Sequence, residues 1–84
     1  MPDLNEQFEA AVAASKTLPK APDQSTMLKM YALFKQATDG DVASKRPGFT
    51  DRVGRAKYDA REAIKGTAPD DAKQQYVSLV DSLK

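Results

Sequence analysis

The residues of this chain that could bind a ligand are lysines and aromatic residues at helical spacing. In the stretch MYALFKQATDGD, residues 30–41, Tyr31 and Lys35 are one helical turn apart. At 100° per residue, Lys35 lies about 40° from Tyr31 and about 20° from Leu28 around the helix axis, inside an apolar arc. A ring for stacking beside a charge for phosphate would suit a nucleotide, for which stacking contributes on the order of 1–3 kcal/mol per base.

Two further lysines border apolar stripes on other helices. Lys16 lies about 40° beyond Val12, and Lys57 lies about 20° past Ile64. In one interpretation, each lysine stem packs along the edge of the core while its ammonium group reaches water. In the other, Lys16, Lys35 and Lys57 converge on one anion, because lysine binds phosphate effectively as a point charge. The spacing leaves both interpretations open.

The side chains on which most enzymes depend are missing or lack a suitable setting. The chain has no His and no Cys, so the commonest general base and the strongest nucleophile are absent. The serines have no recognisable nucleophile elbow around them. The DGD at residues 39–41 resembles the start of a calcium loop, but the fifth position is Ala43 and the twelfth is Thr50. We therefore expect a binding protein with no catalytic residue, no metal and no cofactor.

Charge is distributed unevenly along a chain whose formal net charge is only +1. Between residues 45 and 65, seven basic and three acidic residues give +4, which leaves −3 for the remainder. A local basic surface on a nearly neutral molecule suits a small anionic ligand better than a long polyanion, so we expect no nucleic-acid binding. Acidic residues near residue 1 argue against a signal peptide, and no apolar run approaches the roughly 18 residues of a membrane span. The expected location is the cytoplasm, without stable membrane insertion.

Hydrophobic spacing and capping residues predict four helices and no strands. Their expected bounds are residues 3 to about 15, 23–39, 51–66 and 67 onward. Aspartates are the expected N-caps of the first three helices, at Asp3, Asp23 and Asp51. The fourth helix is expected to begin with a capping-box variant formed by Thr67 and Asp70.

The apolar faces of these helices differ in width. Apolar residues spread over most of the circumference of helix 23–39, which implies contact with more than one helix, or with helices and a ligand. Only the side that carries Lys29 and Gln36 is expected to face water. Tyr76 lies near the centre of the stripe of the last helix. Helix 51–66 has a stripe of mainly small side chains, which implies close packing: Val53, Ala56, Ala60, Ala63 and Ile64.

A long connection separates the second and third helices. Residues 40–50, GDVASKRPGFT, exceed the length of about two to eight residues that is usual between antiparallel helices. Such a segment can cross the molecule from end to end, so that the helices on either side run parallel. The expected fold is an all-α four-helix bundle that forms one domain over residues 1–84. If it does not bind a small ligand, the alternative is a protein–protein interaction module that uses the apolar face of residues 23–39.

Three segments and one tyrosine resemble the acyl-CoA-binding protein family over nearly the whole chain. They are YALFKQATDGDV at 31–42, KRPGFTDRVGRAKYDA at 45–60, IKGTAPDDA at 64–72, and Tyr76. The family pattern reads Tyr-x-x-Tyr-Lys-Gln-Ala-Thr-x-Gly-Asp, then Arg-Pro-Gly, Lys-Ala-Lys-Trp-x-Ala and Leu-Lys-Gly. The resemblance implies up-down-down-up topology. It also implies a carrier that binds medium- to long-chain fatty acyl-CoA thioesters without changing them.

The resemblance also implies which residues contact the ligand. Tyr31 and Lys35 would hold the adenine and 3′-phosphate region, while Lys16 and Lys57 would add charge around the phosphates. Tyr76 would line the path of the pantetheine and the acyl chain. The carrier would be a monomer that makes transient contact with enzymes that use acyl-CoA.

Four positions depart from the family pattern. Phe34, also expected in the binding site, stands where the family usually has a second Tyr, so a ring remains and a hydroxyl is lost. Loss of a hydroxyl that bonds the ligand would cost roughly 0.5–1.5 kcal/mol. Tyr58 replaces the usual Trp, Val53 replaces a frequent Lys, and Arg55 replaces a Lys while keeping its charge. These changes bear on affinity and chain-length preference more than on the kind of ligand.

Overall fold

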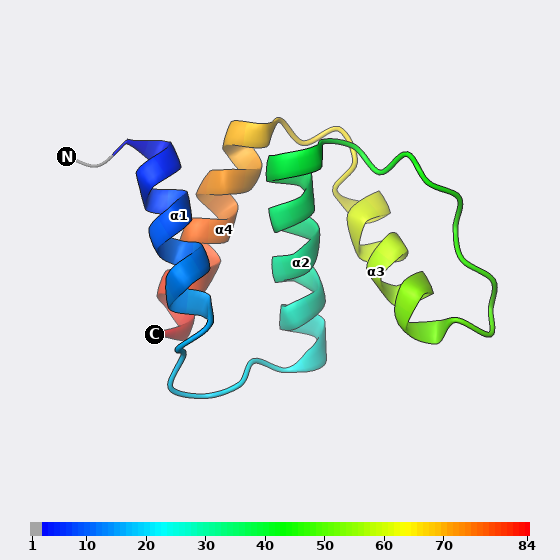
Figure 1. The fold of residues 1–84 in the computed structure, drawn as a ribbon, viewed down its shortest axis with the longest axis horizontal. Coiled ribbons are helices and arrows are strands. Elements are labelled where there is room, and N and C mark those ends of the chain that lie inside the picture. The colour runs from blue at the N-terminus through cyan, green and yellow to red at the C-terminus, as the bar shows by residue number, and fades with distance from the viewer. Residues whose placement is uncertain (1–2) are drawn as a thin grey trace.

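The computed structural model describes residues 3–84, which form four α-helices and a long connection (Figure 1). The helices are α1 (Leu4–Ser15), α2 (Gln24–Asp39), α3 (Arg52–Ala63) and α4 (Pro69–Leu83). In Figure 1, α2 and α3 run in one direction and α1 and α4 in the other, while the connection from α2 returns along the whole length of α3. The predicted all-α bundle with up-down-down-up topology is therefore confirmed. Its second and third helices are parallel because the connection is long enough to span the molecule.

The three predicted aspartate caps are confirmed. A carboxylate oxygen of Asp3, Asp23 or Asp51 accepts a hydrogen bond from the backbone N–H three residues later, at 2.8, 2.7 and 3.0 Å respectively. Each bond satisfies a donor that the first turn of a helix leaves free. Gly40 ends α2 with a positive φ of 82°, a conformation that glycine adopts without a Cβ clash.

The predicted capping box of α4 is wrong. The helix begins at Pro69, its N-cap is Ala68, and among residues 3–84 no side chain caps the free N–H groups of the first turn. Proline at the first helical position presets φ and has no N–H to satisfy, so this helix starts without a side-chain cap. The carbonyl of Thr67 accepts a hydrogen bond from Gln36 of α2 instead.

The buried core is formed by α1, α2 and α4. Leu33 and Val80 are fully buried at its centre, and the predicted central position of Tyr76 is confirmed because only 4% of the residue is exposed. The wide apolar arc of α2 packs against α4 on one side and α3 on the other. The buried residues of the core are Phe8, Ala11, Leu33, Ala37, Ala72, Tyr76 and Val80.

Helix α3 is packed less closely than its small side chains predict. None of its residues is buried, Val53 is 63% exposed, and α2 is the one described helix against which it packs. In Figure 1, α3 lies at one edge of the molecule. A stripe of small residues allows close approach of a neighbouring helix, but this helix has a neighbour on one side alone. The apolar face of α3 is therefore left partly open.

Gln36 corrects a second prediction from the helical wheel. Its side was expected to face water, yet the residue is 1% exposed. The segment between α3 and α4 returns over the last turns of α2, where the Gln36 amide donates to the Thr67 carbonyl. A helical wheel shows only the residues of one helix and not a loop that covers it, so Gln36 was predicted to face solvent.

We expect folding stability to fall as the pH drops below about 4, because three carboxylates titrate at lower pH in the folded protein than in the unfolded chain. The pKa of Asp23 is lowered by the Thr26 backbone N–H, that of Asp41 by the Gln36 amide, and that of Asp59 by Arg46. When a carboxylate has a lower pKa in the folded protein than in the unfolded chain, it stabilises the fold at any pH above the unfolded-state pKa. That stabilisation is lost as the pH falls through the folded-state pKa. Urea unfolding between pH 7 and pH 2 measures this loss.

Asp23→Asn is the control for this pH dependence. Asparagine caps a helix about as well as aspartate but does not titrate, so the variant should fold normally at pH 7 and lose less stability in acid. A wild-type stability that is constant from pH 5 to pH 2 would contradict the prediction.

Candidate functional site: a groove between α2 and α3

The parallel arrangement of α2 and α3 places their first turns side by side and leaves a groove between them. An open cavity of about 430 Å³ lies there. Most of its wall is apolar, contributed by Met27, Leu28 and Val53, and Tyr31 and Lys57 supply an aromatic ring and a charge. Leu28 also lines a second, mainly apolar cavity of about 500 Å³ between α2 and α3, whose other walls include Ala32 of α2 and Ala60 of α3. The open face of α3 is thus part of a groove with both apolar and cationic walls.

Tyr31 and Lys57 meet across this groove. The Lys57 Nζ lies 5.2 Å from the centroid of the Tyr31 ring, within the range of a cation–π contact. Such a contact at an exposed site is worth about 0.5–1 kcal/mol, so an anion could draw the ammonium group away at small cost. A planar base could then take the ring face while Lys57 neutralises a neighbouring phosphate.

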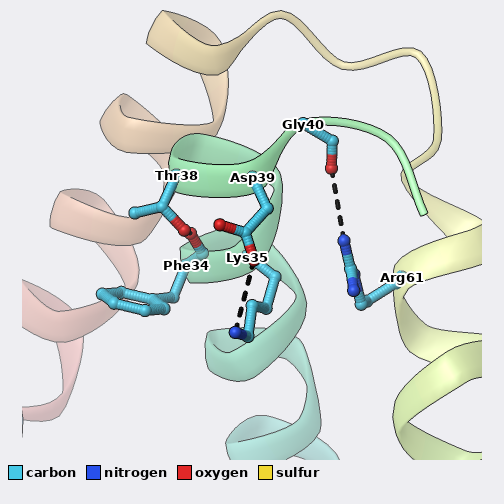
Figure 2. A network of polar contacts seen from close by, with 6 residues as sticks. All are labelled: Phe34, Lys35, Thr38, Asp39, Gly40 and Arg61. Carbon is cyan, nitrogen blue, oxygen red and sulfur yellow. Dashed lines mark hydrogen bonds and ion pairs between the residues drawn. The ribbon is translucent and has the colours of Figure 1, made fainter. Parts of the chain in front are cut away.

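Lys35 forms an ion pair that explains how a charged residue can lie inside the apolar arc of α2. Its Nζ lies 3.3 Å from a carboxylate oxygen of Asp39, one turn further along α2, and its side chain is 35% exposed (Figure 2). The lysine is therefore half-buried with a partner on its own helix. An exposed pair with this spacing contributes about 0.3–0.5 kcal/mol, so the ammonium group remains free to exchange Asp39 for a stronger anion.

Phe34 and Tyr76 are brought together in the core, away from the charged wall of the groove. The Phe34 ring stacks on Phe8 with centroids 5.9 Å apart, and Tyr76 meets Phe8 edge-on at 5.3 Å. The Phe34 and Tyr76 centroids are 6.4 Å apart. Phe34 is half-buried, whereas Tyr76 is almost wholly enclosed, so a ligand could reach Phe34 more readily than Tyr76.

Lys16 stands apart from the other expected site residues. It is exposed at the C-cap of α1, where its backbone N–H donates to the carbonyl of Ala13. Within residues 3–84, no ion pair or cation–π contact joins its side chain to Tyr31, Lys35 or Lys57. Convergence of the three lysines on one anion therefore stays a prediction.

Sequence reasoning missed the apolar wall of the groove. Val53 was assigned to the packed stripe of residues 51–66, and Met27 was not singled out within the wide apolar arc of residues 23–39. Both line the cavity, where Met27 is 55% exposed and Val53 is 63% exposed. The signal that could have found them is the long connection between the helices. If it makes α2 and α3 parallel, apolar residues in the first turns of both helices must lie near each other.

Neither a metal site nor a membrane-spanning helix is found among residues 3–84. No three or more Asp or Glu side chains there are grouped so that they could hold a metal ion. None of the helices combines the length and the apolar character that crossing a bilayer requires.

Comparison with known proteins gives the same answer from sequence and from structure. The family model described as acyl CoA binding protein matches residues 5–80. Acyl-CoA-binding protein homolog 1 of Caenorhabditis elegans is 47% identical over 76 residues, which are 90% of this chain and 88% of the relative. The acyl-CoA-binding protein of Saccharomyces cerevisiae is 39% identical over 80 residues, which are 95% of this chain and 92% of the relative.

Two crystal structures share the fold over most of the chain. Acyl-CoA-binding protein 2 of Oryza sativa superposes with a TM-score of 0.91 at 37% identity, covering 96% of this chain and 90% of that one. The corresponding protein of Moniliophthora perniciosa gives a TM-score of 0.83 at 42% identity, with 89% and 74% covered. The chain therefore belongs to the acyl-CoA-binding protein family.

Proposed function

We propose that this protein binds medium- to long-chain fatty acyl-CoA thioesters in the groove between α2 and α3 and carries them without chemical change. The observation that supports this most is the composition of that groove. Lys57 lies over the Tyr31 ring at 5.2 Å, in the wall of an otherwise apolar cavity. Acyl-CoA has the matching parts, since its head group carries an aromatic base and phosphates and its tail is a hydrocarbon.

The two parts of the ligand would contribute differently to binding. Each methylene group removed from water is worth roughly 0.8 kcal/mol, so a long acyl chain against Met27, Leu28 and Val53 would dominate the affinity. Lys35 and Lys57 would pair with phosphates and set the orientation of the head group. Binding should therefore strengthen with acyl length and weaken moderately as salt screens the charges.

We assign the remaining expected site residues the roles that the resemblance to the family implies, adjusted for their exposure. Tyr31 would stack on the base and Lys16 would add charge from the end of α1. Phe34, which is half-buried, would contact the ligand through its exposed edge, without the hydroxyl that the family usually has there. Tyr76 would contribute mainly by supporting Phe34 within the aromatic cluster, because 4% exposure leaves little of it for a ligand.

The other expected features of the carrier fit this assignment. We propose a monomer of one domain that acts in the cytoplasm and meets acyl-CoA-using enzymes transiently. The apolar arc of α2 packs on α3 and α4, and its exposed part lines the groove, where the acyl chain rather than a protein partner would cover it. Nucleic acid is a poor match because the ion pair between Arg46 and Asp59 already neutralises part of the basic segment.

Isothermal titration of the wild-type protein tests the proposal. Palmitoyl-CoA, octanoyl-CoA, free CoA, free palmitate and an oligonucleotide are compared in the same buffer. Saturable heat with palmitoyl-CoA, and affinity that falls from palmitoyl-CoA to octanoyl-CoA to CoA, is the expected result. The carrier function would be refuted if no acyl-CoA of eight to eighteen carbons gave saturable heat.

A further inference from the structure

Helix α3 carries one half of the groove but has few apolar contacts to hold it. It buries none of its residues and packs against α2 alone among the described helices. Apolar burial is the main force that fixes one helix against another, so packing alone leaves α3 weakly placed. Nevertheless, the contact of Lys57 with the Tyr31 ring requires a definite position of α3 relative to α2.

A buried amide of α2 is bonded to both ends of the chain segment that contains α3. The Gln36 Nε2 donates to Oδ1 of Asp41, before α3, at 2.8 Å, and to the carbonyl of Thr67, after α3, at 2.7 Å. The same Asp41 oxygen accepts the backbone N–H of Gly66 at 2.8 Å. One side chain of α2 thereby joins residue 41 to residues 66 and 67 and closes the segment between them into a loop.

The other polar contacts of this segment are weaker or lie within it. Arg61 of α3 donates from its Nη2 to the carbonyl of Gly40 at 3.4 Å, a long contact that Figure 2 shows at the end of α2. The ion pair of Arg46 with Asp59 joins the connection to α3 and does not reach α2. The Gln36 amide is therefore the strongest described polar link between α2 and the segment that carries α3.

The cost of burying this amide indicates that its donor group is needed. The Gln36 Oε1 is buried without a partner among the described residues. An unsatisfied buried polar atom destabilises a fold, and an apolar side chain of the same size would avoid that loss. What an apolar residue would lack is the pair of hydrogen bonds donated by Nε2.

We propose that Gln36 and Asp41 are positioning residues, which hold α3 where Lys57 meets Tyr31 and so set the affinity of the groove. This inference rests on the proposed function. In the wild-type protein the binding-competent arrangement of α2 and α3 is already populated before the ligand arrives. When the link is broken, apparent affinity falls in proportion to the remaining fraction of that arrangement.

The decisive variant is Gln36→Met, because methionine has a similar length and removes both donors and the unpaired oxygen. If only about one tenth of the variant molecules have α2 and α3 in the binding-competent arrangement, apparent affinity falls about tenfold, and this is the loss that we expect. The factor should be the same for octanoyl-CoA and palmitoyl-CoA, because each ligand loses the same fraction of receptive protein. Amide hydrogen exchange should accelerate in α3 and remain as in wild type in α1, α2 and α4.

Three further variants separate positioning from a general loss of structure. Gln74→Met makes the same replacement on the exposed surface of α4 and should leave affinity and exchange unchanged. Asp41→Ala should resemble Gln36→Met, whereas Asp41→Asn should restore most of the affinity because its amide oxygen still accepts both hydrogen bonds. Rescue by asparagine also shows that the charge of Asp41 is not required.

Two results would overturn the inference: wild-type affinity in Gln36→Met, or exchange that accelerates equally in all four helices. Amide hydrogen exchange tests the positioning role of Gln36 even when no ligand is present. If the wild-type protein bound no acyl-CoA but Gln36→Met still accelerated exchange in α3 alone, the proposed function would fail and the positioning of α3 would stand.

Discussion

Lys57→Met is expected to weaken palmitoyl-CoA binding roughly 10- to 150-fold while leaving the protein folded. Hydrogen bonds to charged groups are worth about 1.5–3 kcal/mol, and each 1.4 kcal/mol corresponds to a factor of ten. Methionine keeps the apolar stem that lines the cavity, so the variant removes the ammonium group with little change in packing. The folded protein loses the contact with Tyr31, which is worth at most about 1 kcal/mol at an exposed position.

Isothermal titration at two salt concentrations, together with thermal unfolding, checks this prediction. The variant should show a smaller decrease of affinity with salt than wild type, because one of the screened charges has been removed. Lys45→Met, which removes an exposed charge from the long connection, is the matched control and should bind like wild type. Equal losses in the two variants would mean that Lys57 acts only through the net charge of the molecule.

Several features of this fold could be predicted from local sequence because local sequence determines them. An aspartate three residues before a free N–H caps a helix whatever its surroundings, so Asp3, Asp23 and Asp51 were identified correctly. The parallel course of α2 and α3 followed from the length of one connection. The lysine beside Tyr31 was notable because 100° per residue is a fixed property of a helix.

Other features depend on what a segment meets in space, which periodicity does not contain. The wheel assigned Gln36 to water, but the loop after α3 covers it and takes one of its hydrogen bonds. The small stripe of α3 has the same pattern whether one or two helices pack on it, so its open face was not foreseen. Lys35 has a partner because Asp39 follows one turn later, and the sequence shows that spacing without showing which of several charges is chosen.

For the candidate site too, some features could be predicted from the sequence and others could not. The resemblance to the family selected Tyr31 and Lys57, and the structure brings this pair together at 5.2 Å. It also selected Tyr76, which the structure encloses, and Lys16, which it leaves exposed at the end of α1. A family pattern identifies positions that matter but does not distinguish a residue that touches the ligand from one that supports a contact.

Leu33→Ala is expected to lower the free energy of unfolding by about 3 kcal/mol, because the residue is 0% exposed and packs in the core of α1, α2 and α4. For a chain of this size, that loss lowers the thermal midpoint by more than about 10 °C. Val53→Ala, at a position that is 63% exposed, should leave the midpoint nearly unchanged. Thermal unfolding followed by circular dichroism compares the two variants.

Binding of a ligand in the groove should also stabilise the variant with the altered core. Leu33 lies away from the residues that line the cavity, so Leu33→Ala should still bind palmitoyl-CoA when folded. At a free concentration of 100 times its dissociation constant, a ligand that binds only the folded state adds about 2.7 kcal/mol of stability. Palmitoyl-CoA should therefore restore most of the lost midpoint, whereas free palmitate should not. A midpoint of Leu33→Ala close to that of wild type without ligand would contradict the central position of Leu33. Failure of saturating palmitoyl-CoA to raise the midpoint would contradict binding to the folded groove.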